Sequence, residues 1–151
     1  MTIADELKLN REIKRLLLVS ALCHDIGKIG IPDAILKKAS RLSSEEYDEM
    51  KLHPTLGAEI VTHMPNAHRF ISGVKHHHEK WDGTGYPDGL KGDEISLLVR
   101  ITTVADIFDA LTTDRPYRPR YSFEEAFSKL RQMKNEVDQT VVEALNTAIR
   151  S

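Results

Sequence analysis

Apolar residues recur three or four positions apart along most of this chain, and no segment alternates apolar and polar residues over a sustained stretch. Ile13, Leu17 and Ala21 form one such stripe, which favours a helix because residues four apart share a helix face. A second stripe runs from Leu98 to Phe108. Since strands require a two-residue alternation, we predict an all-α fold, a bundle of about six to seven helices.

Capping residues and helix breakers divide this pattern. Asn10 can cap the start of one helix, and Ser43 with Glu46 forms a capping box, as Ser122 does with Glu125. Loops are expected over 81–93 and 114–121, which are rich in Gly, Pro or Arg. The helical ranges that we expect are 3–9, 11–25, 44–53, 55–64, 67–78, 95–109, 123–134 and 139–149, with one turn over 33–37.

Composition limits the class of protein. The 151 residues are 40% hydrophobic, enough for one domain with a real core. Acidic and basic residues nearly cancel to a formal net charge of -2, so we expect no binding of polymeric nucleic acid. The single cysteine, Cys23, is typical of a reducing compartment. No apolar run is long enough for a bilayer and the start lacks a basic leader, so we expect a cytoplasmic chain with no membrane segment.

Imidazole and carboxylate groups lie at or near the ends of four of the expected helices. Each has an ordinary interpretation on its own: His24 as a core histidine, His53 as a residue that complements a helix dipole, Asp106 as an acid paired with an arginine. Together they match a site for two ions such as Fe, Mn or Zn, which needs several such side chains from different elements. The candidate ligands are His24, Asp25, His53, His77, His78 and Asp106.

The glycine-rich loop over 81–93 follows two of these histidines and presents Tyr86 beside them. It does not match a calcium loop, because Pro87 and Asp93 stand where an EF-hand needs Gly and Glu. It also lacks the lysine and serine pair of a nucleotide-binding P-loop. We therefore interpret it as a rigid loop that borders a ligand site.

Basic residues flank the expected site. Lys28 follows His24 by about one helical turn, and Arg115, Arg118 and Arg120 follow Asp106. A solvated surface is the ordinary interpretation of such charges. Beside metal ligands, in a chain without net basic charge, they favour a small phosphate ester as the ligand.

Five stretches carry a resemblance to the HD-GYP family, a branch of the HD metal-dependent phosphohydrolases, in the family's order and spacing. They are His24–Pro32 (HDIGKIGIP), Leu52–Pro54 (LHP), His77–Pro87 (HHEKWDGTGYP), Ala105–Leu111 (ADIFDAL) and Arg115–Arg118 (RPYR).

The resemblance implies a single HD-GYP domain over residues 1–151, with two or three divalent ions, commonly iron or manganese. It implies hydrolysis of the bacterial second messenger cyclic di-GMP to linear pGpG, with GMP as an alternative end product. Asp25 would bridge two ions and act with Lys28 in catalysis, Lys28 contacting the scissile phosphate. The dinucleotide would be held by Tyr86, Arg115 and Arg118, and supported or contacted by Asp109. The ligand set that the resemblance implies is His24, Asp25, His53, His77, His78 and Asp106.

One feature departs from the family. Its members carry a further histidine on a helix before the His-Asp pair, whereas residues 1–23 contain no histidine. We therefore expect that the domain is truncated at its N-terminus, which would uncover an apolar face and favour a homodimer.

Two alternatives remain open from the sequence. The chain could be an HD phosphohydrolase for another cyclic dinucleotide or nucleotide. It could also be a catalytically impaired regulatory module that binds a GGDEF-type partner through Gly85, Tyr86 and Pro87.

Overall fold

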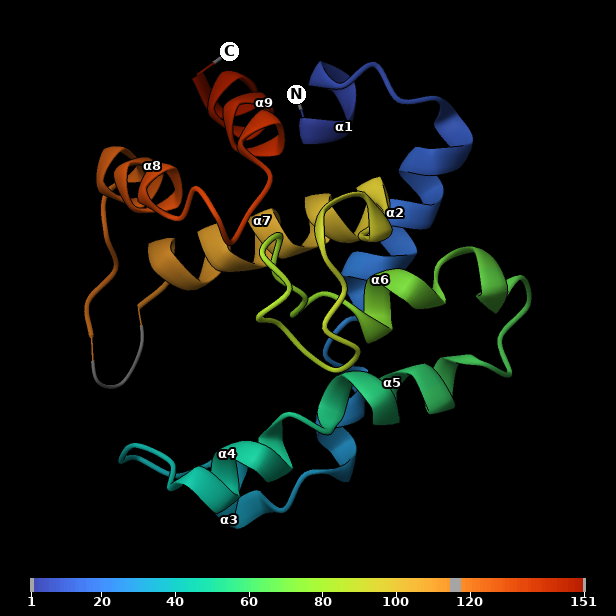
Figure 1. Ribbon diagram of the computed structural model, residues 1–151, viewed down its shortest axis with the longest axis vertical. Coiled ribbons are helices and arrows are strands. Elements are labelled where there is room, and N and C mark those ends of the chain that lie inside the picture. The colour runs from blue at the N-terminus through green and yellow to red at the C-terminus, as the bar shows by residue number, and fades with distance from the viewer. Residues whose placement is uncertain (1, 115–117, 151) are drawn as a thin grey trace.

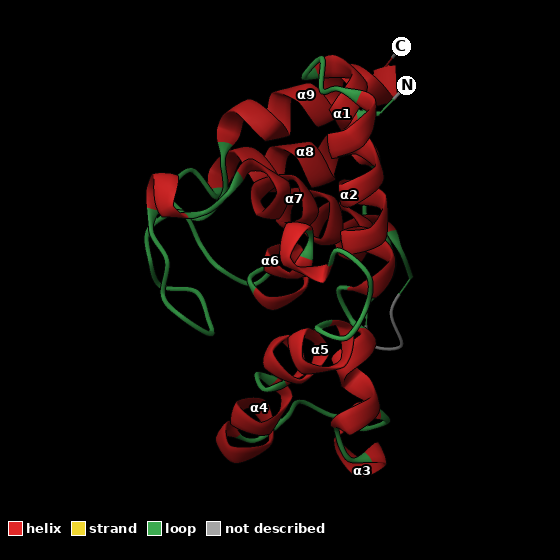
Figure 2. Ribbon diagram, turned by 90° about the vertical axis from the view of Figure 1, so that its right-hand side faces the viewer, coloured by secondary structure: helices red, strands yellow, loops and turns green. Residues whose placement is uncertain are grey.

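The structure is a computed structural model that describes residues 2–114 and 118–150. In these ranges the chain forms α-helices and short 3-10 turns without a strand, which confirms the all-α prediction (Figures 1 and 2). The described residues form more and shorter helical segments than the six to seven expected. The helix predicted over 67–78 is divided into a 3-10 turn over 67–69 and a helix over 71–75, so His77 and His78 lie beyond its end. The α-helices are α1 (Ile3–Glu6), α2 (Arg11–Cys23), α3 (Asp33–Leu36), α4 (Ser44–Met50), α5 (His53–Val61), α6 (Ile71–Lys75), α7 (Leu97–Thr112), α8 (Phe123–Gln132) and α9 (Gln139–Arg150). The 3-10 turns are η1 (Ile26–Gly30), η2 (Ala67–Arg69) and η3 (Gly92–Glu94).

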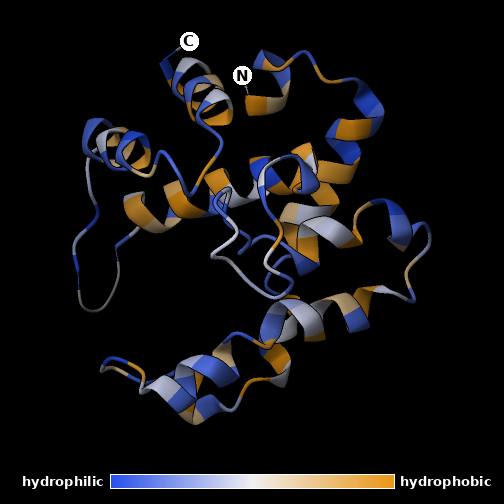
Figure 3. Ribbon diagram, viewed as in Figure 1, coloured by the Kyte–Doolittle hydropathy of each residue, from blue (hydrophilic) through white to orange (hydrophobic). Residues whose placement is uncertain are grey.

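Helix α7 lies at the centre of the fold and contacts α2, α6, α8 and α9. The main core joins α7 to α8 and α9 through fully buried Val104, Leu130 and Val141, and also includes residues of α1 and α2. Figure 3 shows hydrophobic residues along α2 and α7 and mostly hydrophilic ones on α4. Burying apolar surface on several sides of α7 stabilises the helix that carries Asp106.

A second, smaller core lies where α5 packs against α6. It contains Val61 at the end of α5 together with Phe70 and Val74 around the start and middle of α6. Residues of α2 pack against it. This packing brings together the ends of α2 and α6 and the start of α5. In Figure 2 the place where they meet lies above α3 and α4.

The capping predictions are confirmed where they were made. The Asn10 side chain accepts a hydrogen bond from the N–H of Ile13 at 2.9 Å, and the capping boxes of Ser43 and Ser122 open α4 and α8. These interactions satisfy N–H groups that a helix start leaves unpaired.

The predicted helix over 44–53 is wrong at its end. Helix α4 ends at Met50, and His53 is the first residue of α5. Pro54 explains the break, because proline fits the first turn of a helix, where no N–H donor is needed, and disrupts a helix interior. His53 therefore stands at a helix N-terminus instead of a C-terminus.

A close backbone approach joins η1 to α5. A Cβ atom on Gly27 would lie 1.9 Å from the carbonyl oxygen of His53 and 2.4 Å from the backbone nitrogen of Gly57. Only glycine fits at such a contact. Asp25, two residues before Gly27, is held beside His53 by this packing.

Large apolar side chains are exposed on α2 and η1. Leu18, Leu22 and Ile29 are 59%, 76% and 82% exposed. The homodimer expected through an apolar face stays a prediction. No helix in the described part of the chain is both long and apolar enough to cross a bilayer.

Candidate metal centre

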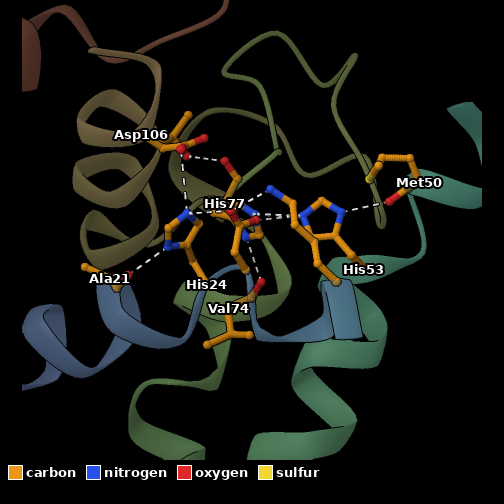
Figure 4. A network of polar contacts seen from close by, with 10 residues as sticks. Ala21, His24, Met50, His53, Val74, His77 and Asp106 are labelled. Atoms are coloured by element: carbon orange, nitrogen blue, oxygen red, sulfur yellow. Dashed lines mark hydrogen bonds and ion pairs between the residues drawn. The ribbon is translucent and has the colours of Figure 1, made fainter. Parts of the chain in front are cut away.

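The six predicted metal ligands come from four elements. His24 is the C-cap of α2 and Asp25 follows it, His53 begins α5, His77 and His78 follow α6, and Asp106 lies in α7. The side chains of His24, His53, His77 and Asp106 converge on one region in Figure 4. Segments far apart in the sequence thus contribute to one cluster.

Three of the histidines make the same kind of contact with the backbone. The Nδ1 atoms of His24, His53 and His77 each lie 2.7 Å from the carbonyl oxygen of the residue three positions earlier. These contacts favour a proton on Nδ1, so that each ring in its neutral form turns the lone pair of Nε2 toward the cluster. Metal-binding histidines are held by this kind of contact, which fixes the ring and its tautomer. The carbonyls belong to Ala21, Met50 and Val74 (Figure 4).

Asp25 lies between two groups of predicted ligands. Its Oδ1 is 3.4 Å from Nε2 of His53 and 4.0 Å from Nε2 of His77. Its Oδ2 is 3.5 Å from Nε2 of His24 and 2.5 Å from Nζ of Lys28. The two carboxylate oxygens therefore face different sides of the cluster.

The charged contacts around Asp25 keep it ionised. Burial acts to raise the pKa of Asp25, but the hydrogen bond and charge of Lys28, with His24 and His53, outweigh burial and lower the pKa below its ordinary value. An ionised carboxylate whose two oxygens face different sides of the cluster can bridge two cations.

Asp106 forms a second pair with His24. Its Oδ1 lies 3.6 Å from Nε2 of His24, and this contact raises the pKa of His24. Burial acts to raise the pKa of Asp106, but the contact with His24 outweighs it and lowers that pKa. His24, Asp106 and Oδ2 of Asp25 therefore gather on one side of the site.

His53, His77 and His78 gather on the other side. Each offers a ring nitrogen, and these atoms all lie within 4.8 Å of one another. Burial is the main cause that lowers the pKa of His53, that of His77 to about 3 and that of His78 to about 4. Neutral imidazoles at this spacing, beside an ionised Asp25, fit a divalent cation.

Tyr86 lies against this cluster as predicted. Its ring stacks on that of His78, with 4.9 Å between the centroids and 22° between the planes. Burial, with a smaller effect of Tyr47, raises the pKa of Tyr86, so its hydroxyl stays protonated.

Arg118 has other partners than the cluster. Its guanidinium donates to the carbonyl oxygens of Ala110, Leu111 and Pro119 at 2.7, 3.4 and 3.0 Å, and lies 4.3 Å from the centroid of the Tyr121 ring. It satisfies carbonyls at the end of α7, as basic residues often do.

The other two candidates for substrate binding are less defined. Asp109 is exposed on α7, one turn beyond Asp106. Arg115 falls outside the described residues. Their roles stay predictions.

Two further residues support the site without having been singled out from the sequence. Glu79 is 2% exposed and accepts backbone N–H groups of the loop after it. The hydroxyl of Thr103 donates to the carbonyl oxygen of His77 at 2.9 Å. Glu79 directly follows His77 and His78, two of the predicted ligands, and this position is a signal that sequence reasoning could use. The partner of Thr103 depends on how α7 packs.

The family model described as HD domain matches residues 1–141. The chain belongs to the HD domain family. Its histidine cluster can hold a divalent ion, as membership of this family implies. Its resemblance to the HD-GYP branch is supported by a solved structure, Bd1817, an HDG"Y"P protein from Bdellovibrio bacteriovorus. The two match with a TM-score of 0.77 and 26% identity over 99% of this chain and 48% of that one.

Two curated relatives of this HD domain are similar in sequence over much of its length. The cyclic di-GMP phosphodiesterase response regulator RpfG of Xanthomonas campestris pv. campestris is 40% identical over 95% of this chain and 39% of its own length. The 3'3'-cGAMP-specific phosphodiesterase 3 of Vibrio cholerae is 40% identical over 86% of this chain and 28% of its own length. The chain spans less than half of the length of each of these proteins.

Proposed function

We propose that this HD domain hydrolyses the phosphodiester bonds of cyclic di-GMP to pGpG, with GMP as an alternative end product, at a centre of two or three iron or manganese ions. The observation that carries the proposal is the position of Asp25, whose two oxygens face two separate groups of metal-binding side chains. The names of relatives such as RpfG support the choice of substrate.

The residues divide between two ion positions in this proposal. His53, His77 and His78 would hold one ion, His24 and Asp106 another, and Asp25 would bridge them. When bound, a pair of divalent ions supplies Lewis acidity and a water whose pKa lies near neutrality.

Lys28 and Tyr86 would act on the substrate. The ammonium of Lys28 lies 2.5 Å from Asp25, so a phosphate bound beside Asp25 would place its developing negative charge next to Lys28. Tyr86 would contact the dinucleotide from its place on the ring of His78. Arg115, Arg118 and Asp109 remain predicted contacts on the α7 side.

Hydrolysis of 3'3'-cGAMP is a second candidate function. The relative from Vibrio cholerae named for this substrate has the same identity to the chain as RpfG, 40%, over 86% of the chain instead of 95%. The two substrates differ only in one purine base, so the phosphodiester chemistry would be the same.

Docking of a GGDEF-type protein on Gly85, Tyr86 and Pro87 is a separate proposal for the same loop. Tyr86 already packs on His78, so a bound partner would cover the site. Loss of such binding in Tyr86→Ala, measured on metal-free protein, would support it.

The proposed activity is tested with purified protein loaded anaerobically with Fe²⁺ or Mn²⁺ and given cyclic di-GMP or 3'3'-cGAMP. We expect pGpG from the first substrate, and loss of turnover in the double variant His24→Ala, Asp25→Ala. His63→Ala is the matched control, because His63 is exposed. Metal-loaded protein that opens only 3'3'-cGAMP would favour the second candidate, and protein inert on both would refute the two.

A further inference from the structure

A buried carboxylate fastens the glycine-rich loop that carries Tyr86. Glu79 is 2% exposed. Its Oε1 accepts the N–H groups of Asp88 and Gly89 at 2.7 and 3.1 Å, and its Oε2 accepts that of Leu90 at 3.0 Å. Three N–H groups from consecutive residues thus converge on one side chain.

These contacts account for the burial of an acidic side chain. The nearby cations have other partners: Lys75 pairs with Asp88 at 2.7 Å and Lys80 with Glu136 at 2.7 Å. Within the described residues, the hydrogen bonds of the Glu79 side chain are all accepted from the loop backbone. Hydrogen bonds to a charged acceptor are stronger than those to a neutral one, so the loop is held firmly at this point.

The fastened segment, residues 88–90, begins two residues after Tyr86. The N–H of Tyr86 donates to the carbonyl oxygen of His78 at 3.3 Å, and its ring stacks on the His78 ring. A Cβ atom on Gly85 would lie 2.5 Å from Cα of Glu79. The loop therefore passes against the backbone of residues 78–80, and its placement determines where Tyr86 sits relative to His78.

The base of the loop is held by different contacts. The N–H of Trp81 donates to the carbonyl oxygen of Glu136 at 2.8 Å, and the guanidinium of Arg100 lies 4.6 Å from the centroid of the Trp81 ring. The two attachments use separate residues. Loss of the Glu79 contacts should release residues 86–90 while Trp81 stays in place.

We propose that Glu79 is a positioning residue that fastens the tip of this loop and so holds Tyr86 against His78, where Tyr86 meets the substrate. The role of Tyr86 toward substrate rests on the proposed function. The attachment of the loop by Glu79 can be tested without it.

The test compares wild type with Glu79→Gln. Glutamine keeps the size of the side chain but replaces one acceptor oxygen by an N–H₂ group that cannot pair with a backbone N–H. We expect amide hydrogen exchange at residues 88–90 to speed up by about tenfold or more, and KM for cyclic di-GMP to rise by about tenfold, with a smaller change in kcat. Bound metal and Trp81 fluorescence should match wild type.

Glu94→Gln is the matched control. Glu94 is exposed, lies near the end of the same loop and accepts one backbone N–H, that of Lys91, at 2.9 Å. It should leave both exchange at residues 88–90 and KM as in wild type. A Glu79→Gln protein with a lower melting temperature but unchanged exchange and KM would overturn the proposal.

Amide exchange also decides two further cases. If Glu79→Gln does not fold, wild-type exchange decides: amides 88–90 must be protected although residues 88 and 89 are exposed, and exchange at the rates of an unstructured peptide would overturn the proposal. If wild type hydrolyses no cyclic di-GMP, the proposed function fails, and amide exchange in wild type and variant still decides whether Glu79 fastens the loop.

Discussion

The Nε2 atoms of His53 and His77 face each other at 3.3 Å although each ring already donates its Nδ1 proton to a backbone carbonyl. Neither Nε2 then carries a proton to share, so two lone pairs point at one another in a buried setting. Oδ1 of Asp25, 3.4 Å from Nε2 of His53, adds a third acceptor. Acceptors without a donor repel one another, and a cation between them would remove that cost.

The first prediction concerns metal and stability. Mn²⁺ or Fe²⁺ should stabilise the folded protein by about 2.7 kcal/mol when free metal is a hundredfold above Kd, because only the folded state brings these acceptors together. Thermal unfolding with and without metal after chelation measures it. His77→Ala should remove most of the stabilisation while exposed His68→Ala retains it. Equal shifts in both variants would contradict this site.

The second prediction concerns Asp25. Asp25→Asn removes the charge that faces both ligand groups, so bound metal and phosphodiesterase activity should fall by more than the ~10–100-fold typical for loss of a residue that only supports a ligand. Metal analysis and product chromatography measure the two effects. Asp33→Asn makes the same change on an exposed carboxylate of α3 and should leave both unchanged.

The third prediction separates Lys28 from the ligands. Lys28→Met should lower kcat by about 10²–10³, the effect of removing one group that stabilises transition-state charge. Bound metal should stay near the wild-type amount, since Lys28 contacts Asp25 and offers no lone pair. Lys37→Met, on an exposed residue of α3, serves as the control. A loss of metal equal to the loss of activity would refute this division of roles.

Features decided by neighbouring residues were predictable from the sequence. The starts of α2, α4 and α8 follow from Asn10, Ser43 and Ser122, because a cap acts within one turn. The end of α4 does not follow from Pro54 alone, because a proline after His53 fits both a helix that ends there and a helix that starts there. A proline alone does not decide between these two.

Features decided by packing were not predictable in the same way. Repeated imidazole and carboxylate groups at helix ends indicate a shared site, and the resemblance implies that Asp25 bridges two ions. Which oxygen of Asp25 faces which histidine depends on how the helices pack. Arg118 was predicted as a substrate contact from its motif alone, and its carbonyl partners at the end of α7 depend on the path of the chain. The same holds for Glu79, whose partners lie nine to eleven residues away in an irregular loop.

The fourth prediction tests the contact that joins the two halves of the site. A Cβ atom on Gly27 would lie 1.9 Å from the carbonyl oxygen of His53, and this neighbour is backbone that cannot rotate away. Gly27→Ala should therefore separate η1 from α5 and lower the free energy of unfolding by about 3–5 kcal/mol, with loss of metal binding as Asp25 moves from His53.

Gly30→Ala is the matched control for this contact. The atom nearest to its Cβ would be Cδ1 of Leu56, at 2.9 Å, the end of a side chain that can change rotamer. It should cost less than about 1.5 kcal/mol and keep metal binding. Chemical denaturation and metal titration of the two variants compare them directly. Similar values for both would mean that the backbone approach at Gly27 does not hold Asp25 and His53 together.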